Sequence, residues 1–189
     1  MNLNADSFDA LQLDLAKRSL WNIGYFYAGL TFWIYVALAG MYYPLEVAKI
    51  YWLVGTFCIF PIAILASKII GAEPFTKGNK LADLVGYTHM SVIALTFPII
   101  IAVFIYFPEA MLLVMAIAYC LDFYVMSWAF GSPFFGVHAA LRIILVSIIW
   151  FALPEWRISI IPIVVACAYL ITVAFLPIIR KKWLANKSI

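Results

Sequence analysis

Long uncharged runs alternate with short polar segments along the whole chain. A helix needs about 20 apolar residues to cross about 30 Å of hydrocarbon, and runs of that size recur through the sequence. The longest apolar region contains Asp122 and Arg142, and Gly131-Ser132-Pro133 in its middle is a turn signal. Dividing the region there predicts six spans, at residues 22–43, 45–70, 85–107, 110–130, 134–153 and 158–179.

These runs lack the polar and apolar alternation of barrel strands. Every backbone amide in lipid needs an internal partner, so helices are the remaining solution. The predicted fold is an all-α integral membrane protein, a six-transmembrane helix bundle made of three hairpins. The bundle occupies residues 21–179, an N-terminal amphipathic helix occupies residues 1–20, and a basic cytoplasmic tail occupies residues 180–189.

Composition agrees with a lipid environment. The 189 residues are 67% hydrophobic and 11% charged, whereas soluble domains are about 25% charged. The net charge of +3 is not concentrated in a basic patch outside the chain ends. These values exclude a soluble enzyme and a nucleic-acid-binding protein.

The N-terminal segment is polar enough to lie at the membrane surface. Phe8, Leu11 and Leu15 share one helix face, and Lys17 and Arg18 close the helix at its C-terminal end. We therefore expect an interfacial amphipathic helix.

Basic residues fall mainly on one side of the predicted bundle, and the cytoplasmic side normally carries this excess. One side carries Lys17, Arg18, Lys68, Lys77, Lys80, Arg180, Lys181, Lys182 and Lys187. The opposite side carries only Lys49 and Arg157. Both termini are therefore predicted to be cytoplasmic.

The three connections on the opposite side share a local pattern. Each has a proline followed by a glutamate: Pro44 and Glu46, Pro108 and Glu109, and Pro154 and Glu155. Proline suits the first helical turn, and glutamate there favours the positive end of the helix dipole. The second, fourth and sixth spans are predicted to begin at these tips.

Four polar residues fall at similar depths inside the predicted spans. Asp122 precedes Phe130 by eight residues and Arg142 follows Phe134 by eight, so both lie about 12 Å from the cytoplasmic boundary. Charged groups in a span cost roughly 2.5 to 3.5 kcal/mol, so these two are expected to pair. His138 shares the helix face of Arg142, and His89 lies at a similar level.

This cluster of Asp122, Arg142, His138 and His89 has two interpretations. In the first, the ion pair only holds two helices in register. In the second, it is a cytoplasm-facing ion, proton or anion site, with Arg142 as the anion contact and the histidines as pH-sensitive partners. The spacing is not diagnostic of a metal site, and no metal or cofactor is predicted.

The loop between the second and third spans is basic. Lys68, Lys77 and Lys80, together with Asn79, are predicted to contact anionic lipid headgroups or a cytoplasmic partner. Anchoring by positive charge alone explains the lysines equally well.

Part of the chain resembles a family of small bacterial multi-pass membrane proteins that is catalogued as a domain of unknown function. The resemblance covers about a third of the chain and rests on Phe60-Pro61, Ser67-Lys68, Gly71, Pro74-Phe75, Lys77, Asn79, Leu81, Phe97-Pro98 and Pro108-Glu109. The chain departs from that family in the fourth span, where it has Asp122. The resemblance implies the bacterial inner membrane and supplies no activity.

Three functions are compatible with these patterns. The leading hypothesis is a small transporter or channel, non-enzymatic and homo-oligomeric, that uses the polar cluster for an ion or small solute. The alternative is a membrane-embedded sensor or anchor subunit that binds a cytoplasmic protein. The third is a lipid-modifying enzyme with His89 and His138 as acid and base.

Overall fold

The computed structural model describes residues 5–187 of the chain, with side chains from residue 7 onward. Residues 1–4 of the predicted N-terminal helix and residues 188–189 of the predicted tail lie outside this range. The described chain is helical and contains no strand. Its elements are α1 (Ala5–Arg18), η1 (Leu20–Asn22), α2 (Ile23–Tyr42), α3 (Leu45–Ile69), α4 (Lys80–Tyr106), η2 (Pro108–Ala110), α5 (Met111–Ala118), α6 (Leu121–Ala129), α7 (Pro133–Ala152) and α8 (Arg157–Lys187).

Six helical segments are long and apolar enough to cross a membrane, which confirms the six spans predicted within the described chain. They are Leu20–Tyr42, Leu45–Ile69, Lys80–Tyr106, Pro108–Ala129, Pro133–Ala152 and Arg157–Lys187. The fourth segment combines η2, α5 and α6. The chain is therefore an all-helical, multi-pass membrane protein.

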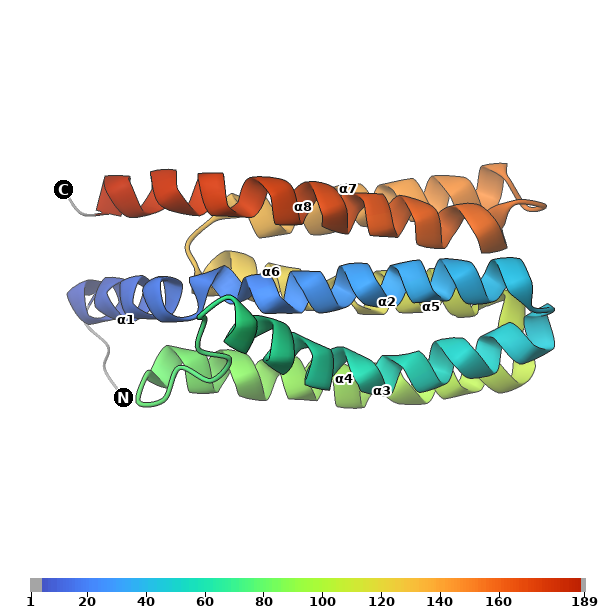
Figure 1. The fold of residues 1–189 in the computed structure, drawn as a ribbon, viewed down its shortest axis with the longest axis horizontal. Coiled ribbons are helices and arrows are strands. Elements are labelled where there is room, and N and C mark those ends of the chain that lie inside the picture. Colours follow the sequence, from blue (N-terminus) through green and yellow to red (C-terminus); the bar gives the residue numbers. More distant parts are fainter. Residues whose placement is uncertain (1–4, 188–189) are drawn as a thin grey trace.

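The long helices run nearly side by side, and successive connections alternate between the two ends of the bundle (Figure 1). α2 packs along its length against both α3 and α8. Its buried side chains include Phe26, Phe32 and Trp33. Trp52 of α3 is fully buried and donates its indole N–H to the Val36 carbonyl at 3.1 Å. The core of the bundle therefore centres on α2.

Two glycines of α2 allow its neighbours to approach closely. A Cβ atom on Gly24 would lie 2.1 Å from Ser67 Oγ, and one on Gly29 would lie 2.3 Å from Cε1 of Tyr169. Both distances are far below van der Waals contact. Gly24 thus sets the spacing of α2 and α3, and Gly29 makes room for an α8 ring that faces the bundle core.

A left-handed turn joins α1 to α2. Leu20, Trp21 and Asn22 have φ values of 49°, 58° and 55°, a conformation that costs non-glycine residues roughly 1 to 2 kcal/mol each. Trp21 is fully buried and contacts the rings of Phe130, Phe135 and Trp183. Aromatic burial offsets the backbone strain and fixes the direction of α1.

α1 packs against the bundle rather than standing apart from it. It lies alongside the last turns of α8 and runs lengthwise beyond the end of α2 (Figure 1). Lys187 pairs with Asp9 at 2.5 Å, and Arg180 Nε donates to the Ala16 carbonyl at 2.9 Å. The predicted basic tail is thus a continuation of α8 as far as Lys187. The position of α1 relative to a membrane surface stays a prediction.

α4 is the most peripheral long helix. Only Leu81 and Ile100 of its residues are buried, and it contacts α1, α5 and α6. Its apolar outer face is suited to lipid.

Candidate functional site

Arg142 lies in the centre of the bundle, on the buried face of α7. It is 1% exposed, and its Nη2 donates to the Ala116 carbonyl at 3.0 Å. The guanidinium carbon lies 5.3 Å from the ring centre of Phe123 and 5.1 Å from that of Tyr169. Within residues 5–187, Nε and Nη1 have no hydrogen-bond partner. The guanidinium therefore retains unused donors inside the protein.

The carbonyl that Arg142 binds belongs to a break in the fourth span. α5 ends at Ala118 and α6 begins at Leu121. At the break, Cys120 N–H bonds the Ile117 carbonyl, one residue later than in a continuous α-helix. This shift leaves the Ala116 carbonyl to Arg142. In membrane transporters, such discontinuous helices commonly supply backbone groups to the binding site.

Asp122 pairs with a histidine instead of with Arg142. Its Oδ2 lies 2.8 Å from His89 Nδ1, with the two side chains 12% and 30% exposed. Oδ1 has no partner in the described chain. The predicted ion pair between Asp122 and Arg142 is therefore wrong. Asp122 in the first turn of α6 faces α4, whereas Arg142 faces the broken end of α5.

His138 lies one turn before Arg142 and faces α8. Its Nδ1 lies 2.8 Å from Oγ of Thr172, and that hydroxyl donates to the Ala168 carbonyl at 2.9 Å. Because the hydroxyl has a single proton, His138 Nδ1–H is then the donor and Nε2 is an acceptor. Nε2 is buried and has no partner among the described residues.

The predicted cluster thus lies in the core as three adjoining units rather than one. We call these units, Arg142, His89–Asp122 and His138–Thr172, the polar core. The Phe123 ring joins two of the units, with its centre 4.9 Å from the His138 ring centre. Sequence reasoning missed Tyr169 and Thr172, although two polar residues three apart in an apolar run were a usable signal.

The predicted lipid-contact residues separate into two groups. Lys68, Lys77 and Lys80 are exposed at the end of the bundle that holds α1. Asn79 is only 1% exposed, whereas the sequence predicted that it contacts lipid headgroups or a cytoplasmic partner. Its Oδ1 accepts from the N–H groups of Leu81 and Ala82, which caps α4. Its Nδ2 donates to the Leu11 carbonyl and to Asp14, so the side chain is used entirely within the protein.

Arg18 completes this network. Its guanidinium bonds Asp14, both oxygens of Glu73 and the Lys77 carbonyl. The guanidinium lowers the pKa of the Glu73 carboxyl, and Glu73 raises the pKa of Arg18. We call Asp14, Arg18, Glu73 and Asn79 the terminal latch, because they fasten α1 to the loop before α4.

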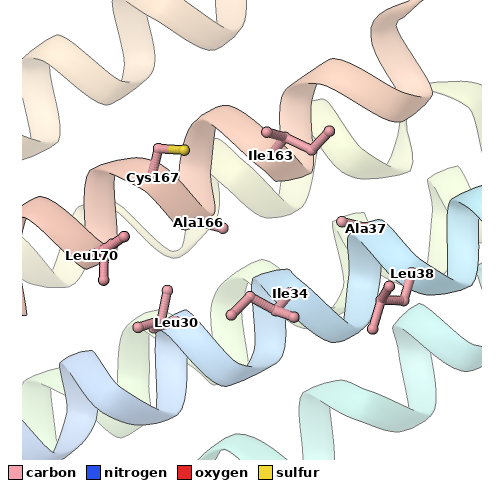
Figure 2. Close-up of a pocket in the computed structure, with 8 residues that line it drawn as sticks. All are labelled: Leu30, Ile34, Ala37, Leu38, Ile163, Ala166, Cys167 and Leu170. Atoms are coloured by element: carbon pink, nitrogen blue, oxygen red, sulfur yellow. The ribbon is translucent and has the colours of Figure 1, made fainter.

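An apolar groove of about 260 Å³ lies between α2 and α8 (Figure 2). Figure 2 shows that its walls include Leu30, Ile34 and Leu38 of α2 and Ile163 and Leu170 of α8. Among the described residues, those that line this groove are uncharged.

A multi-pass helical bundle with a buried polar core is the class of protein that these features define. The chain belongs to the family of unknown function DUF7010, which matches residues 8–178. This match confirms the resemblance and extends it over most of the chain. No curated protein and no solved structure matches.

Proposed function

We propose that this protein transports a small monovalent anion across the membrane and that Arg142 binds the anion. The observation that carries the proposal is the fully buried guanidinium with Nε and Nη1 unpaired in the described chain. An uncompensated charge in a bundle is costly. The nearest predicted counter-ion, Asp122, is occupied by His89. An anion is the ligand that would complete the guanidinium.

The surroundings of Arg142 favour a small anion with one charge. The Phe123 and Tyr169 rings flank a single guanidinium. Unused N–H donors match chloride or a small oxyanion such as nitrate or formate. The break between α5 and α6 provides a place where the bundle can change shape around the ligand.

We propose that the end carrying α1 is cytoplasmic, in the bacterial inner membrane, which places the connection of α2 to α3 outside. The excess of lysine and arginine at the α1 end supports this orientation. Exposed Lys68, Lys77 and Lys80 would then attract anionic headgroups. The alternative of a sensor or anchor for a cytoplasmic protein is less favoured, because α1 and the end of α8 are already packed on each other. The homo-oligomer stays a prediction.

Anion flux into liposomes tests the transport proposal. Purified protein is reconstituted with entrapped lucigenin, whose quenching reports chloride entry, and valinomycin with potassium balances the charge. Nitrate and formate are added as competitors. Arg142→Gln is expected to reduce uptake about tenfold to a hundredfold, since a hydrogen bond to a charged group contributes about 1.5 to 3 kcal/mol.

Two controls accompany this measurement. Lys182→Gln removes an exposed charge from α8 and is expected to leave uptake unchanged, and Arg142→Lys should retain part of the activity. Gel filtration verifies that each variant is folded. Uptake by Arg142→Gln at the wild-type rate, or no chloride uptake by the wild type, contradicts the proposal.

A further inference from the structure

A second cavity, which is polar, lies at the end of the bundle opposite α1. It has a volume of about 460 Å³ and lies where α3, η2, α7 and α8 meet. Glu46, Glu109, Ala110, Trp150 and Arg157 are among its lining residues. We call it the outer pocket. Unlike the groove between α2 and α8, it contains both charges and aromatic rings.

In the two ion pairs at this end of the bundle the cation is the more buried partner, although Lys49, unlike Arg157, does not line the outer pocket. Arg157 pairs with Glu109, and the side chains are 21% and 59% exposed. Lys49 pairs with Glu46 at 2.5 Å, and these side chains are 14% and 71% exposed. In both pairs the acid is the more solvated partner. Such exposed pairs are weak, so another anion can displace the carboxylate.

Aromatic rings hold both cations independently of the acids. The Arg157 guanidinium carbon lies 4.1 Å from the Trp150 ring centre, and Lys49 Nζ lies 5.1 Å from that of Phe104. Cation–π contacts of this kind position a guanidinium without neutralising its charge. Displacement of Glu109 would therefore leave Arg157 in place to receive a ligand.

The outer pocket lies about two helical turns from Arg142 along α7. Trp150, Val146 and Arg142 are four residues apart and share one helix face, so Trp150 and Arg142 are separated by about 12 Å along the axis. Val146 between them is fully buried. The pocket and the polar core are thus adjoining levels of the same side of the bundle.

We infer that the outer pocket captures a small anion at Arg157, in place of Glu109, before the anion reaches Arg142. The inference rests on the proposed transport function for the identity of the anion. It adds a second, outward-facing binding site and names Arg157 as its anion contact.

Charge-selective cysteine labelling tests the pocket without measuring transport. Ala110→Cys places a thiol in the pocket lining. Purified protein in detergent is treated with a methanethiosulfonate that carries either a sulfonate or a trimethylammonium group. The ratio of the sulfonate rate to the cationic rate is expected to be about tenfold higher at Ala110→Cys than at an exposed reference cysteine. We call this raised ratio the sulfonate preference, and Arg157→Gln is expected to abolish it.

Matched controls isolate the effect of the pocket. Tyr42→Cys lies at the same end, is highly exposed and does not line the pocket, so it is the reference cysteine that gives the intrinsic rate ratio of the two reagents. The wild type reports labelling of the native cysteines. Sodium nitrate at 100 mM should slow sulfonate labelling of Ala110→Cys more than sodium gluconate at equal ionic strength.

The outcomes separate the two proposals. A rate ratio at Ala110→Cys no higher than that at Tyr42→Cys, or a sulfonate preference that survives Arg157→Gln, overturns the capture site even if chloride uptake depends on Arg142. A preference that depends on Arg157 and falls with nitrate supports the capture site even if liposome uptake fails. In liposomes, Arg157→Gln should also raise the half-saturating chloride concentration about tenfold; an unchanged value contradicts capture at Arg157.

Discussion

The terminal latch and the polar core are both built from charged and amide side chains, but they differ in how completely those groups are bonded. In the latch, Asn79 makes four hydrogen bonds and Arg18 engages Asp14, Glu73 and a carbonyl. In the core, Arg142 has one bonded nitrogen, and Asp122 and His138 each retain an unpaired atom within the described chain. Side chains whose hydrogen bonds are all made hold the fold together, whereas buried side chains with unpaired donors or acceptors are available for a ligand.

Replacing Arg142 by methionine should produce the largest loss of activity and a small loss of stability. Methionine keeps much of the volume and removes the buried charge, a change that is often neutral or stabilising. We expect chloride uptake at the background of empty liposomes and a free energy of unfolding within about 1 kcal/mol of the wild type. Uptake and denaturant titration in detergent check both quantities. If Arg142→Met lost more unfolding free energy than Asn79→Ala, the core rather than the latch would be the stabilising region, which would contradict the account.

Asn79→Ala should produce the opposite result. It removes the cap of α4 and leaves Asp14 and the Leu11 carbonyl without this donor, so we expect a loss of about 2 to 4 kcal/mol in unfolding free energy. Uptake per folded molecule should be unchanged. Asn186→Ala, at an exposed position of α8, is the matched control and should alter neither. Equal stability of the two variants would mean that the latch contributes little.

Gly29→Ala connects the packing of α2 to the polar core. The added methyl group overlaps the Tyr169 ring, which flanks Arg142, so we expect a loss of about 1 to 3 kcal/mol together with reduced uptake. Gly86→Ala in α4 is the control, because nothing lies within 4 Å of its added Cβ. Denaturant titration and chloride uptake of both variants measure the difference. Wild-type uptake by Gly29→Ala would show that the Tyr169 position is not required.

Acid should weaken the latch by a smaller amount. Arg18 lowers the pKa of Glu73 from its ordinary value of 4.5, so this pair stabilises the folded protein above that value. The contribution is lost as the pH falls through the lowered pKa. The thermal midpoint of the wild type should exceed that of Glu73→Gln at pH 7, and the gap should close below about pH 4. A difference between the two thermal midpoints that grows as the pH falls would contradict this prediction.

Hydrophobic patterning predicted most of the fold because lipid imposes a minimum helix length. The predicted span at 22–43 corresponds to α2 (Ile23–Tyr42). α4 begins five residues before the predicted start, because Asn79 caps it while Lys80 and Asp83 remain in its exposed first turn. α8 continues past residue 179 because α1 packs on its last turns. Contacts with distant segments determine these ends, and a local pattern does not contain them.

Four residues of the polar core were predictable from the sequence, but Thr172 and the pairing of the side chains were not. Counting residues along a helix gives depth, so Asp122, Arg142, His138 and His89 were all placed in the interior. The direction in which each faces depends on helix rotation and on the break at Cys120, neither of which has a local signal. For the same reason Tyr169 and the Ala116 carbonyl, both neighbours of Arg142, were not predicted.

Anion binding to the purified protein is the most direct test of the central claim that Arg142 is an anion site. The thermal midpoint is measured in detergent against sodium nitrate, with sodium gluconate at equal ionic strength as reference. Binding to the folded state alone must raise the midpoint as nitrate increases. The account predicts a clearly larger rise for the wild type than for Arg142→Met, in which only the outer pocket remains to bind nitrate, and the same rise in both proteins would contradict it.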